Sequence, residues 1–405
     1  MLNLRKNIII LAINTVLAII KGGSTRSKLK IAVNTRLLLE GRLEGIGWFS
    51  YENLKRITIA HPEHQFYFIF DRPYHPGFIF GPNVTPVVIG PPARHPVLYF
   101  IWFELSVRYQ LKKLGADVFL SPDGYLSLGS KVPSLTVFHD LNFEHYPKSL
   151  PFAERWYYRT FFPRYARKAR RIATVSEFSK SDIIRHYGIS PSKIDVVYNG
   201  ANEAYAPLDD AGKEETRARY SEGKPYFFFV GSLHPRKNLI NLFRAFDLFR
   251  KTDTAGTKLL IAGAKKWWTG EIAMVYNTMQ YRDSVIFTDR LETSEMNYVM
   301  GSALALAYVS YFEGFGIPIV EAFRCGTPVI TSDVTSMPEV AGTAALLADP
   351  FDPESIAGAM KRIAEDGELR SRLIEKGFER ARIFTWDKSA ERLWATIERV
   401  IGESC

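Results

Sequence analysis

The order of apolar segments along this chain constrains the fold more than any other feature. From Lys28 onward, short apolar runs that favour β-strands alternate with longer stretches whose apolar residues recur at helical spacing. Such alternation is typical of βα units, in which helices connect neighbouring strands of a parallel sheet. Several runs are apolar almost throughout, as expected for strands covered on both faces. We therefore expect an α/β fold.

The predicted strands fall into two groups. In the first half they lie at Lys30–Thr35, Gln65–Phe70, Pro86–Ile89, Asp117–Ser121, Ser134–His139, Arg171–Ser176 and Asp195–Tyr198. In the second half they lie at Tyr226–Gly231, Lys258–Ala262, Ser284–Thr288, Ala303–Tyr308, Pro328–Thr331 and Ala344–Leu347. The charged segment 203–225 between them reads as a linker. This pattern predicts two Rossmann-like, doubly wound domains that face each other across a cleft, with ligands at the carboxyl ends of the strands.

Residues 1–27 precede this pattern and form an apolar and basic extension. The apolar run Asn7–Ile20 is shorter than the about 20 residues that a helix needs to span a bilayer, and no clear small-residue cleavage site follows it. We expect the extension to lie outside the fold, with a membrane anchor as the alternative.

The composition indicates which classes of partner and which cellular compartment fit this chain. The 405 residues carry a formal net charge of +9, which suits nucleic acid, an anionic membrane or phosphorylated small molecules. Only two cysteines occur, so no disulfide framework is implied and a reducing compartment, the cytoplasm, fits best.

Two stretches of the first half, 98–114 and 155–171, are both aromatic and basic. They suit half-buried helices with a solvated cationic face, or a surface for a lipid-linked acceptor and for peripheral association with the inner face of a membrane. No nucleic-acid-binding motif accompanies them, so we expect no nucleic acid partner.

The segment 313–328, EGFGIPIVEAFRCGTP, is the most informative motif. It follows a predicted strand, and Pro318 marks the first turn of a helix that Gly326 ends. The Gly314-Phe315-Gly316 turn brings backbone amides to the N-terminus of that helix, where an anion such as a diphosphate is bound favourably.

Two glutamates flank this turn. Glu321 lies about one turn into the helix, where its carboxylate can accept hydrogen bonds from a vicinal diol such as a ribose. Glu313 precedes the turn and can accept a hydrogen bond from a sugar hydroxyl. With the Cys-Gly-Thr-Pro-Val-Ile sequence that follows, the pair resembles the donor motif of glycosyltransferase family 4, a large retaining family of the type-B fold.

The resemblance extends over nearly the whole chain from residue 28. It implies an acceptor-binding domain at 28–205 and a donor-binding domain at 206–385. It also implies that a C-terminal helix at 386–405 crosses back to the first domain.

A second stretch that resembles the family follows the first predicted strand of the second half. It contains Gly231, Arg236 and Lys237. In the family, Arg and Lys at this place lie on the donor diphosphate, and fixed cations stabilise the charge that a departing nucleoside diphosphate gathers. Arg236 can grip two phosphate oxygens, while Lys237 acts as a point charge. A solvated basic pair is the alternative.

Weaker matches lie elsewhere in the two halves. Arg290 and Leu291 follow a strand in a turn that reads the nucleotide base in the family, although Asp289 stands where glycine is common. Gly45 and Gly47 resemble the family's glycine-rich loop near the donor phosphates.

His139 ends a predicted strand where the family often places a histidine near the transferred sugar. We expect it to help position the anomeric carbon, with Asp140 setting its tautomer; a structural histidine is the alternative.

Missing motifs also inform the prediction. The sequence contains no Asp-x-Asp, no GxGxxG after a strand and no GxxxxGK[ST], which argues against a metal-bound donor diphosphate, a dehydrogenase and a P-loop NTPase. The resemblance thus implies a metal-independent retaining transferase that moves a hexose, of mannose or glucose type, from a nucleoside diphosphate sugar to a hydroxyl of a glycan or lipid-linked acceptor. A nucleotide-sugar epimerase or hydrolase of the same fold, or a non-catalytic sugar-binding protein, is the alternative.

Overall fold

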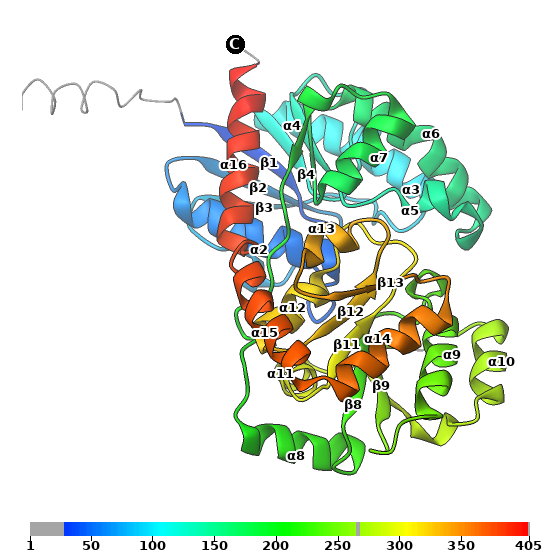
Figure 1. Cartoon of the computed structure of the whole chain (residues 1–405). Helices are drawn as coiled ribbons and strands as arrows, with labels where there is room; N and C mark the ends of the chain where they lie inside the picture. The colour runs from blue at the N-terminus through cyan, green and yellow to red at the C-terminus, as the bar shows by residue number, and fades with distance from the viewer. Residues whose placement is uncertain (1–27, 265–267, 404–405) are drawn as a thin grey trace, which may run out of the picture.

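The chain folds into two α/β domains, each built on a parallel sheet (Figure 1). The computed structural model describes residues 28–264 and 268–403. The expectation for residues 1–27 therefore falls outside the described residues.

The N-terminal sheet has seven strands in the order β3-β2-β1-β4-β5-β6-β7. Their bounds are β1 Lys30–Asn34, β2 Gln65–Phe70, β3 Val84–Val88, β4 Val118–Ser121, β5 Ser134–Phe138, β6 Arg171–Thr174 and β7 Ile194–Val196. Every pairing in it is parallel, as between β1 and β2, where Lys30 lies opposite Gln65.

The C-terminal sheet has six parallel strands in the order β10-β9-β8-β11-β12-β13. Their bounds are β8 Tyr226–Val230, β9 Lys258–Ala262, β10 Val285–Asp289, β11 Ala305–Tyr308, β12 Val329–Ser332 and β13 Leu346–Ala348. All 13 strands match predicted ones and differ only at their ends. The predicted fold class, two doubly wound α/β domains, is confirmed.

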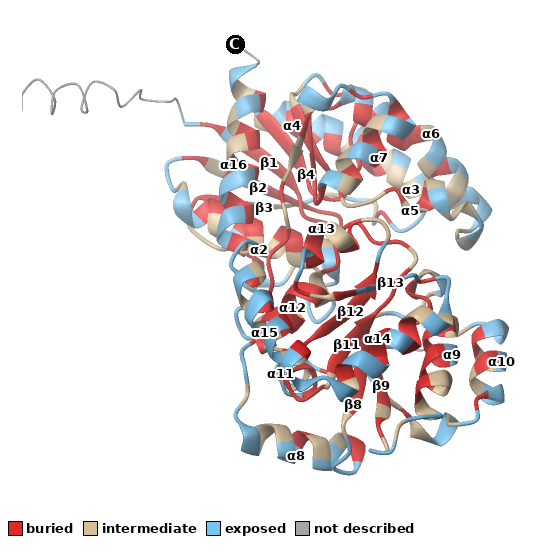
Figure 2. Ribbon diagram, in the orientation of Figure 1, coloured by how far each residue is buried: buried red, intermediate tan, exposed pale blue. Residues whose placement is uncertain are grey.

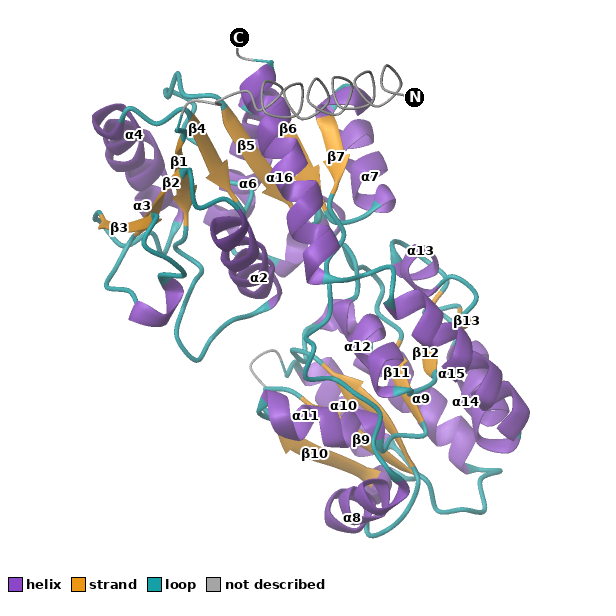
Figure 3. Ribbon diagram, turned by 90° about the vertical axis from the view of Figure 1, so that its left-hand side faces the viewer, coloured by secondary structure: helices purple, strands orange, loops and turns teal. Residues whose placement is uncertain are grey.

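Helices cover both faces of each sheet (Figure 3). In the N-terminal domain they are α2 Gly45–Ala60, α3 Pro96–Ile101, a π-helical turn Trp102–Val107, α4 Arg108–Leu114, α5 Asn142–His145, α6 Phe152–Lys168 and α7 Glu177–Tyr187. In the C-terminal domain they are α8 Asp210–Ser221, α9 Leu239–Arg250, α10 Gly270–Thr278, α11 Thr293–Gly301, α12 Ile317–Cys325, α13 Met337–Ala341, α14 Pro353–Glu365 and α15 Gly367–Ala381. The inner strands, such as β4, β5 and β11, are buried throughout, as Figure 2 shows, which explains why their sequences are continuously apolar rather than alternating.

The last helix, α16 (Trp386–Gly402), leaves the C-terminal domain and packs on the N-terminal one. It contacts α2 and the strands β4, β5 and β6, and Figure 1 shows it in red along the N-terminal sheet. The contact is tight where the chain passes between domains: a Cβ on Gly200 would lie 2.4 Å from the backbone nitrogen of Trp386.

Strand order reverses between β1 and β4 in one sheet and between β8 and β11 in the other. Ligands of doubly wound sheets bind at such switch points, beyond the carboxyl ends of the strands. The loops that follow β5 and β11 touch, since a Cβ on Gly314 would lie 2.0 Å from the backbone oxygen of His139. The carboxyl ends of strands from the two sheets thus meet at the domain boundary, one strand away from the switch point of the N-terminal sheet and at that of the C-terminal sheet.

Candidate active site

Three charged side chains meet at the carboxyl ends of β8 and β11. Glu313 forms ion pairs with Lys237, at 2.6 Å between Oε1 and Nζ, and with Arg236, at 2.9 Å between Oε2 and Nη1. Lys237 also donates to the hydroxyl of Tyr308 at 2.5 Å, and Arg236 donates to the backbone oxygen of Phe312 at 3.1 Å. The structure therefore brings together three residues that were predicted to serve the donor.

Burial and charge act against each other in this cluster. Burial alone would raise the pKa of Glu313, but the neighbouring Arg236 and Lys237 outweigh it and lower that pKa to about 2. Burial lowers the pKa of Lys237 to about 8, although the Glu313 carboxylate opposes the shift. A phosphate group that approached these cations would compete with Glu313 for them.

The Gly314–Gly316 turn leads into α12 as the motif predicts. Gly316 is the N-cap of α12 with φ of 100°, and its left-handed conformation favours glycine. Phe315 is buried in the core, so the backbone amides rather than this side chain are the groups that the turn offers to an anion. Gly326 ends α12 with φ of 68°, the expected C-cap.

Glu321 lines a small cavity between the domains, of about 60 Å³. The other lining residues are Trp48, Asn202, Tyr205, Ile317 and Trp386. Burial raises the pKa of Glu321 to about 7, with a partial opposing effect of the Tyr205 hydroxyl. Ligand pockets measure about 300–1,000 Å³, so a nucleoside can enter only if these side chains move apart.

His139 points its ring into the N-terminal domain. Its Nε2 donates to the backbone oxygen of Pro122 at 2.8 Å, which leaves Nδ1 as an acceptor. Burial lowers the pKa of this imidazole, so its neutral form is favoured. Asp140 instead accepts from the backbone and side-chain nitrogens of Asn142, at 3.0 and 2.7 Å. The prediction that Asp140 sets the tautomer is therefore wrong. The contact with the Pro122 oxygen places the ring proton on Nε2, and the Asp140 carboxylate is paired with Asn142 instead.

The three predicted glycines differ in their local surroundings. Gly45 begins α2 and has open space where a Cβ would stand. Gly47 packs closely, since a Cβ there would lie 3.1 Å from the backbone oxygen of Leu37. Gly231 has φ of 145° and lies against Lys237.

Arg290 and Leu291, predicted to read the base, do not line the cavity beside Glu321. Arg290 is exposed and Leu291 is buried. The preceding Asp289 has φ of 54°, a left-handed conformation that glycine adopts more readily than other residues. Their roles stay a prediction.

Some residues at the site gave no signal in the sequence. Trp48 and Tyr205, which flank Glu321, come from separate segments that only the fold brings together. The segment 173–179 caps helix α7, because Ser176 Oγ accepts from the backbone nitrogen of Ser179 at 3.0 Å. Ser176 Oγ also donates to the backbone oxygen of Gly314 at 2.7 Å, across the domain boundary.

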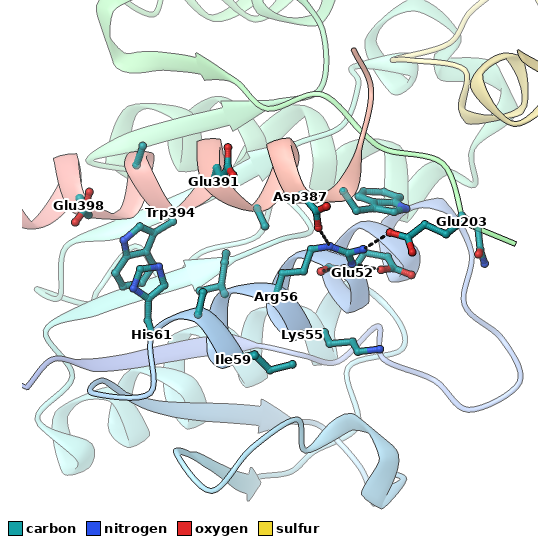
Figure 4. Close-up of a pocket in the computed structure, with 16 residues that line it drawn as sticks. Glu52, Lys55, Arg56, Ile59, His61, Glu203, Asp387, Glu391, Trp394 and Glu398 are labelled. Atoms are coloured by element: carbon teal, nitrogen blue, oxygen red, sulfur yellow. Dashed lines mark hydrogen bonds and ion pairs between the residues drawn. The ribbon is translucent and has the colours of Figure 1, made fainter. Parts of the chain in front are cut away.

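A larger groove, of about 920 Å³, lies between α2 and α16 (Figure 4). Trp394 lines the groove, and its ring stacks on that of His61, with 3.7 Å between the ring centroids. Arg56 bridges it through ion pairs with Asp387 at 2.6 Å and Glu203 at 3.1 Å. None of the predicted site residues lines this groove.

Within residues 28–264 and 268–403, one cluster has the composition of a metal site: His145, Asp182 and His186. Both histidines pair with the Asp182 carboxylate, at 2.9 and 3.1 Å. The cluster contains none of the predicted donor residues. Across the same part of the chain, no helix combines the length and apolarity that crossing a bilayer requires.

Comparison with known proteins identifies relatives for both domains. The family model for glycosyl transferases group 1 matches residues 212–380, and the model for glycosyltransferase family 4 matches residues 60–205. O-antigen chain mannosyltransferase B of Escherichia coli is 26% identical over 85% of this chain and 93% of its own length. O-antigen chain mannosyltransferase RfbU of Salmonella typhimurium is 30% identical over 72% of this chain and 77% of its own length.

Solved structures share the fold. Anabaena Alr3699/HepE, solved with UDP and glucose, superposes with a TM-score of 0.71 at 16% identity, covering 91% of this chain and 99% of that one. WaaG, a glycosyltransferase involved in lipopolysaccharide biosynthesis, superposes with a TM-score of 0.68 at 18% identity, covering 90% of this chain and 98% of that one. By its fold, its matched family models and its relatives, the chain belongs to glycosyltransferase family 4, the group 1 glycosyl transferases.

Proposed function

We propose that this glycosyltransferase moves a mannosyl unit, with retention at the anomeric carbon, from a nucleoside diphosphate sugar to a hydroxyl of a glycan or lipid-linked acceptor. The observation that carries the proposal is the cluster of the half-buried Arg236 with the buried Lys237 and Glu313, beside the N-terminus of α12 and next to the contact of Gly314 with His139. The names of the relatives support mannose as the sugar.

In the proposed donor complex, the diphosphate lies between the α12 N-terminus and the cations Arg236 and Lys237. Glu313 then exchanges part of its pairing with these cations for a sugar hydroxyl. When the bond from the anomeric carbon to the β-phosphate oxygen breaks, negative charge gathers on that oxygen, and the two cations stabilise it. The acceptor oxygen forms the new bond on the same face, and its proton passes to the leaving phosphate.

His139 and Glu321 take separate parts in this proposal. His139 Nδ1, left as an acceptor by the Pro122 contact, receives a hydrogen bond from a sugar hydroxyl and helps to position the anomeric carbon. Glu321 accepts from the ribose diol. Because Glu321 lies in the C-terminal domain and His139 in the other, the donor contacts both, and the reactive geometry forms only when the domains are closed.

The acceptor side of the proposal rests on an exposed aromatic and basic face of the N-terminal domain. On α6, the side chains of Phe152 and Trp156 are 73% and 56% exposed, and on α3, Phe100 is 44% exposed. Exposed cations of the same face include Arg159, Arg164, Arg167 and Lys168. Aromatic and cationic side chains together favour the interface of an anionic membrane. We propose that this face meets the inner side of the membrane, where a lipid-linked acceptor is presented.

The function is tested by incubating the protein with radiolabelled GDP-mannose, UDP-glucose or ADP-glucose and a lipid extract of bacterial membranes. We expect label to move into the lipid or glycan fraction, and the product to keep the anomeric configuration of the donor. Free sugar without acceptor would indicate a hydrolase, an altered sugar an epimerase, and an unconsumed donor that still binds a sugar-binding protein; each would contradict the proposal.

The membrane face is tested by sedimentation with vesicles. We expect the protein to sediment with phosphatidylglycerol vesicles more than with phosphatidylcholine vesicles, and Trp156→Ala with Phe152→Ala to weaken that binding. Tyr298→Ala, on the exposed surface of the C-terminal domain, is the matched control. Equal binding by both variants would contradict the assignment of this face.

A further inference from the structure

Helix α7 of the N-terminal domain has its N-terminus capped by the other domain. The Glu339 carboxylate, on α13, accepts from the backbone nitrogens of Glu177 at 2.8 Å and Phe178 at 3.0 Å. These are the first two nitrogens of α7, which have no partner inside the helix. A carboxylate at a helix N-terminus is also stabilised by the helix dipole. The cap of α7 is therefore complete only while the domains touch.

The same helix holds the turn that is proposed to bind the diphosphate. Ser176 Oγ, the N-cap of α7, donates to the backbone oxygen of Gly314 at 2.7 Å, and Ser179 Oγ donates to it at 3.3 Å. Gly314 in turn lies against the backbone of His139, where a Cβ would approach the oxygen to 2.0 Å. The Gly314–Gly316 turn, called the donor turn below, thus forms one contact region with α7 and His139.

Helix α13 connects Glu339 to this turn from the other side. Its preceding residue, Ser336, donates through Oγ to the backbone oxygens of Glu313 at 2.9 Å and Phe315 at 3.2 Å. Arg380 anchors the far end of α13 by donating to the backbone oxygen of Val340 at 2.9 Å. A shift of Glu339 relative to α7 is therefore transmitted to the backbone on both sides of Gly314.

We propose that Glu339, Ser176 and Gly314 form an interdomain latch that holds the donor turn in its reactive position against His139, with Glu339 as a positioning residue. Glu339 touches neither donor nor acceptor. It acts by favouring the closed arrangement of the domains. In that arrangement Arg236 and Lys237 of the C-terminal domain and His139 of the N-terminal domain contact the same donor molecule. This inference rests on the proposed transfer function.

The latch is tested with Glu339→Gln, which replaces one accepting oxygen by a donating amide that faces the backbone N–H groups of α7. Glu339→Asp keeps the carboxylate and tests for partial rescue, and Ser176→Ala removes the contact with Gly314. Glu375→Gln, exposed on α15, is the matched control. Each variant is compared for turnover with the preferred donor, affinity for the free nucleoside diphosphate, melting temperature and radius of gyration by small-angle X-ray scattering.

Loss of a helix cap corresponds to a shift of about tenfold in the closed-to-open equilibrium. We expect Glu339→Gln to lower turnover about tenfold and to raise the radius of gyration, with nucleoside diphosphate affinity changed less than about threefold, because the proposed diphosphate and ribose partners Arg236, Lys237 and Glu321 all belong to the C-terminal domain. The turnover and the radius of gyration of Glu339→Asp should lie between those of Glu339→Gln and those of the wild type. Glu375→Gln should match the wild type in both.

Wild-type turnover and an unchanged radius of gyration in Glu339→Gln would overturn the latch. So would a parallel loss of turnover, nucleotide affinity and melting temperature, which would indicate a general role in folding. If the wild-type protein transfers no sugar, the proposed function fails instead, whereas the scattering comparison still tests the latch because it needs no substrate.

Discussion

The backbone oxygen of His139 lies so close to Gly314 that a Cβ on that glycine would stand 2.0 Å from it. This contact joins the loop after β5 to the loop after β11, and so joins the two domains at the place where the donor is proposed to bind. Only glycine allows it, since real Cβ atoms do not approach an oxygen so closely.

Gly314→Ala should therefore separate the domains locally. We expect turnover to fall by at least about tenfold, because the donor turn can no longer meet His139, while both cores stay folded. Gly358→Ala is the control: that glycine lies within α14 with open space around its Cβ position, so the change should stabilise the helix by about 1 kcal/mol. Melting curves and turnover measured on both variants decide the matter, and a fully active Gly314→Ala would show that the contact is dispensable.

His139→Ala should lower turnover with a much smaller effect on nucleoside diphosphate affinity. The proposed contact of His139 is with the transferred sugar, whereas the proposed diphosphate and ribose partners, Arg236, Lys237 and Glu321, belong to the other domain. Losing one positioning hydrogen bond corresponds to about 1–3 kcal/mol in the barrier, or about 5- to 150-fold in rate. Calorimetry with the nucleoside diphosphate and steady-state rates give the two quantities. An equal loss of both would place His139 elsewhere, and an unchanged rate would make it a packing residue.

Glu321 should make nucleotide affinity depend on pH. Its pKa is raised by burial to about 7 from an ordinary value of 4.5, and the ionised form is the better acceptor for a ribose diol. Affinity for the nucleoside diphosphate should rise as the pH rises through about 7. In Glu321→Gln this rise should disappear, and affinity above that pH should fall about tenfold. An unaltered pH profile in the variant would show that the ribose binds elsewhere.

The same shift predicts a change in stability. Between pH 4.5 and about 7 the folded protein holds a proton on Glu321 that the unfolded chain has lost, so the free energy of unfolding should decline as the pH rises through this window. Glu321→Gln removes this contribution. Denaturant titrations of both proteins at pH 5 and pH 8 check the sign, and a wild-type protein that gains stability relative to the variant at the higher pH would contradict it.

Donor turnover should not require a divalent metal. Arg236 and Lys237 supply the positive charge that a metal would otherwise give to the diphosphate, and the sequence contains no Asp-x-Asp. We expect the rate in excess EDTA to match the rate with added Mg²⁺. Loss of turnover in EDTA that Mg²⁺ or Mn²⁺ restores would contradict this expectation.

Much of the fold could be predicted because βα alternation leaves its mark in local sequence. All strands of both sheets were expected, and so was the helix that begins beside Pro318 and ends at Gly326. The motifs also placed Arg236, Lys237 and Glu313 in one site.

Contacts between distant segments could not be predicted in the same way. The tautomer of His139 is set by the backbone of Pro122, which carries no side-chain signal. The cap that Glu339 places on α7 joins positions 162 residues apart in the chain, and only the docking of the two domains brings them together.

The central claim is that Lys237, with Arg236, binds the donor diphosphate. Isothermal titration calorimetry in EDTA, with GDP, UDP and ADP as ligands, tests it most directly when wild type is compared with Lys237→Met and with Lys361→Met, an exposed lysine of α14. We predict that the nucleotide preferred by the wild type binds Lys237→Met at least about tenfold more weakly, since a charge-assisted contact to phosphate is lost. Lys361→Met should bind as wild type does, and melting curves should show that both variants are folded. Undiminished binding by folded Lys237→Met would contradict the account.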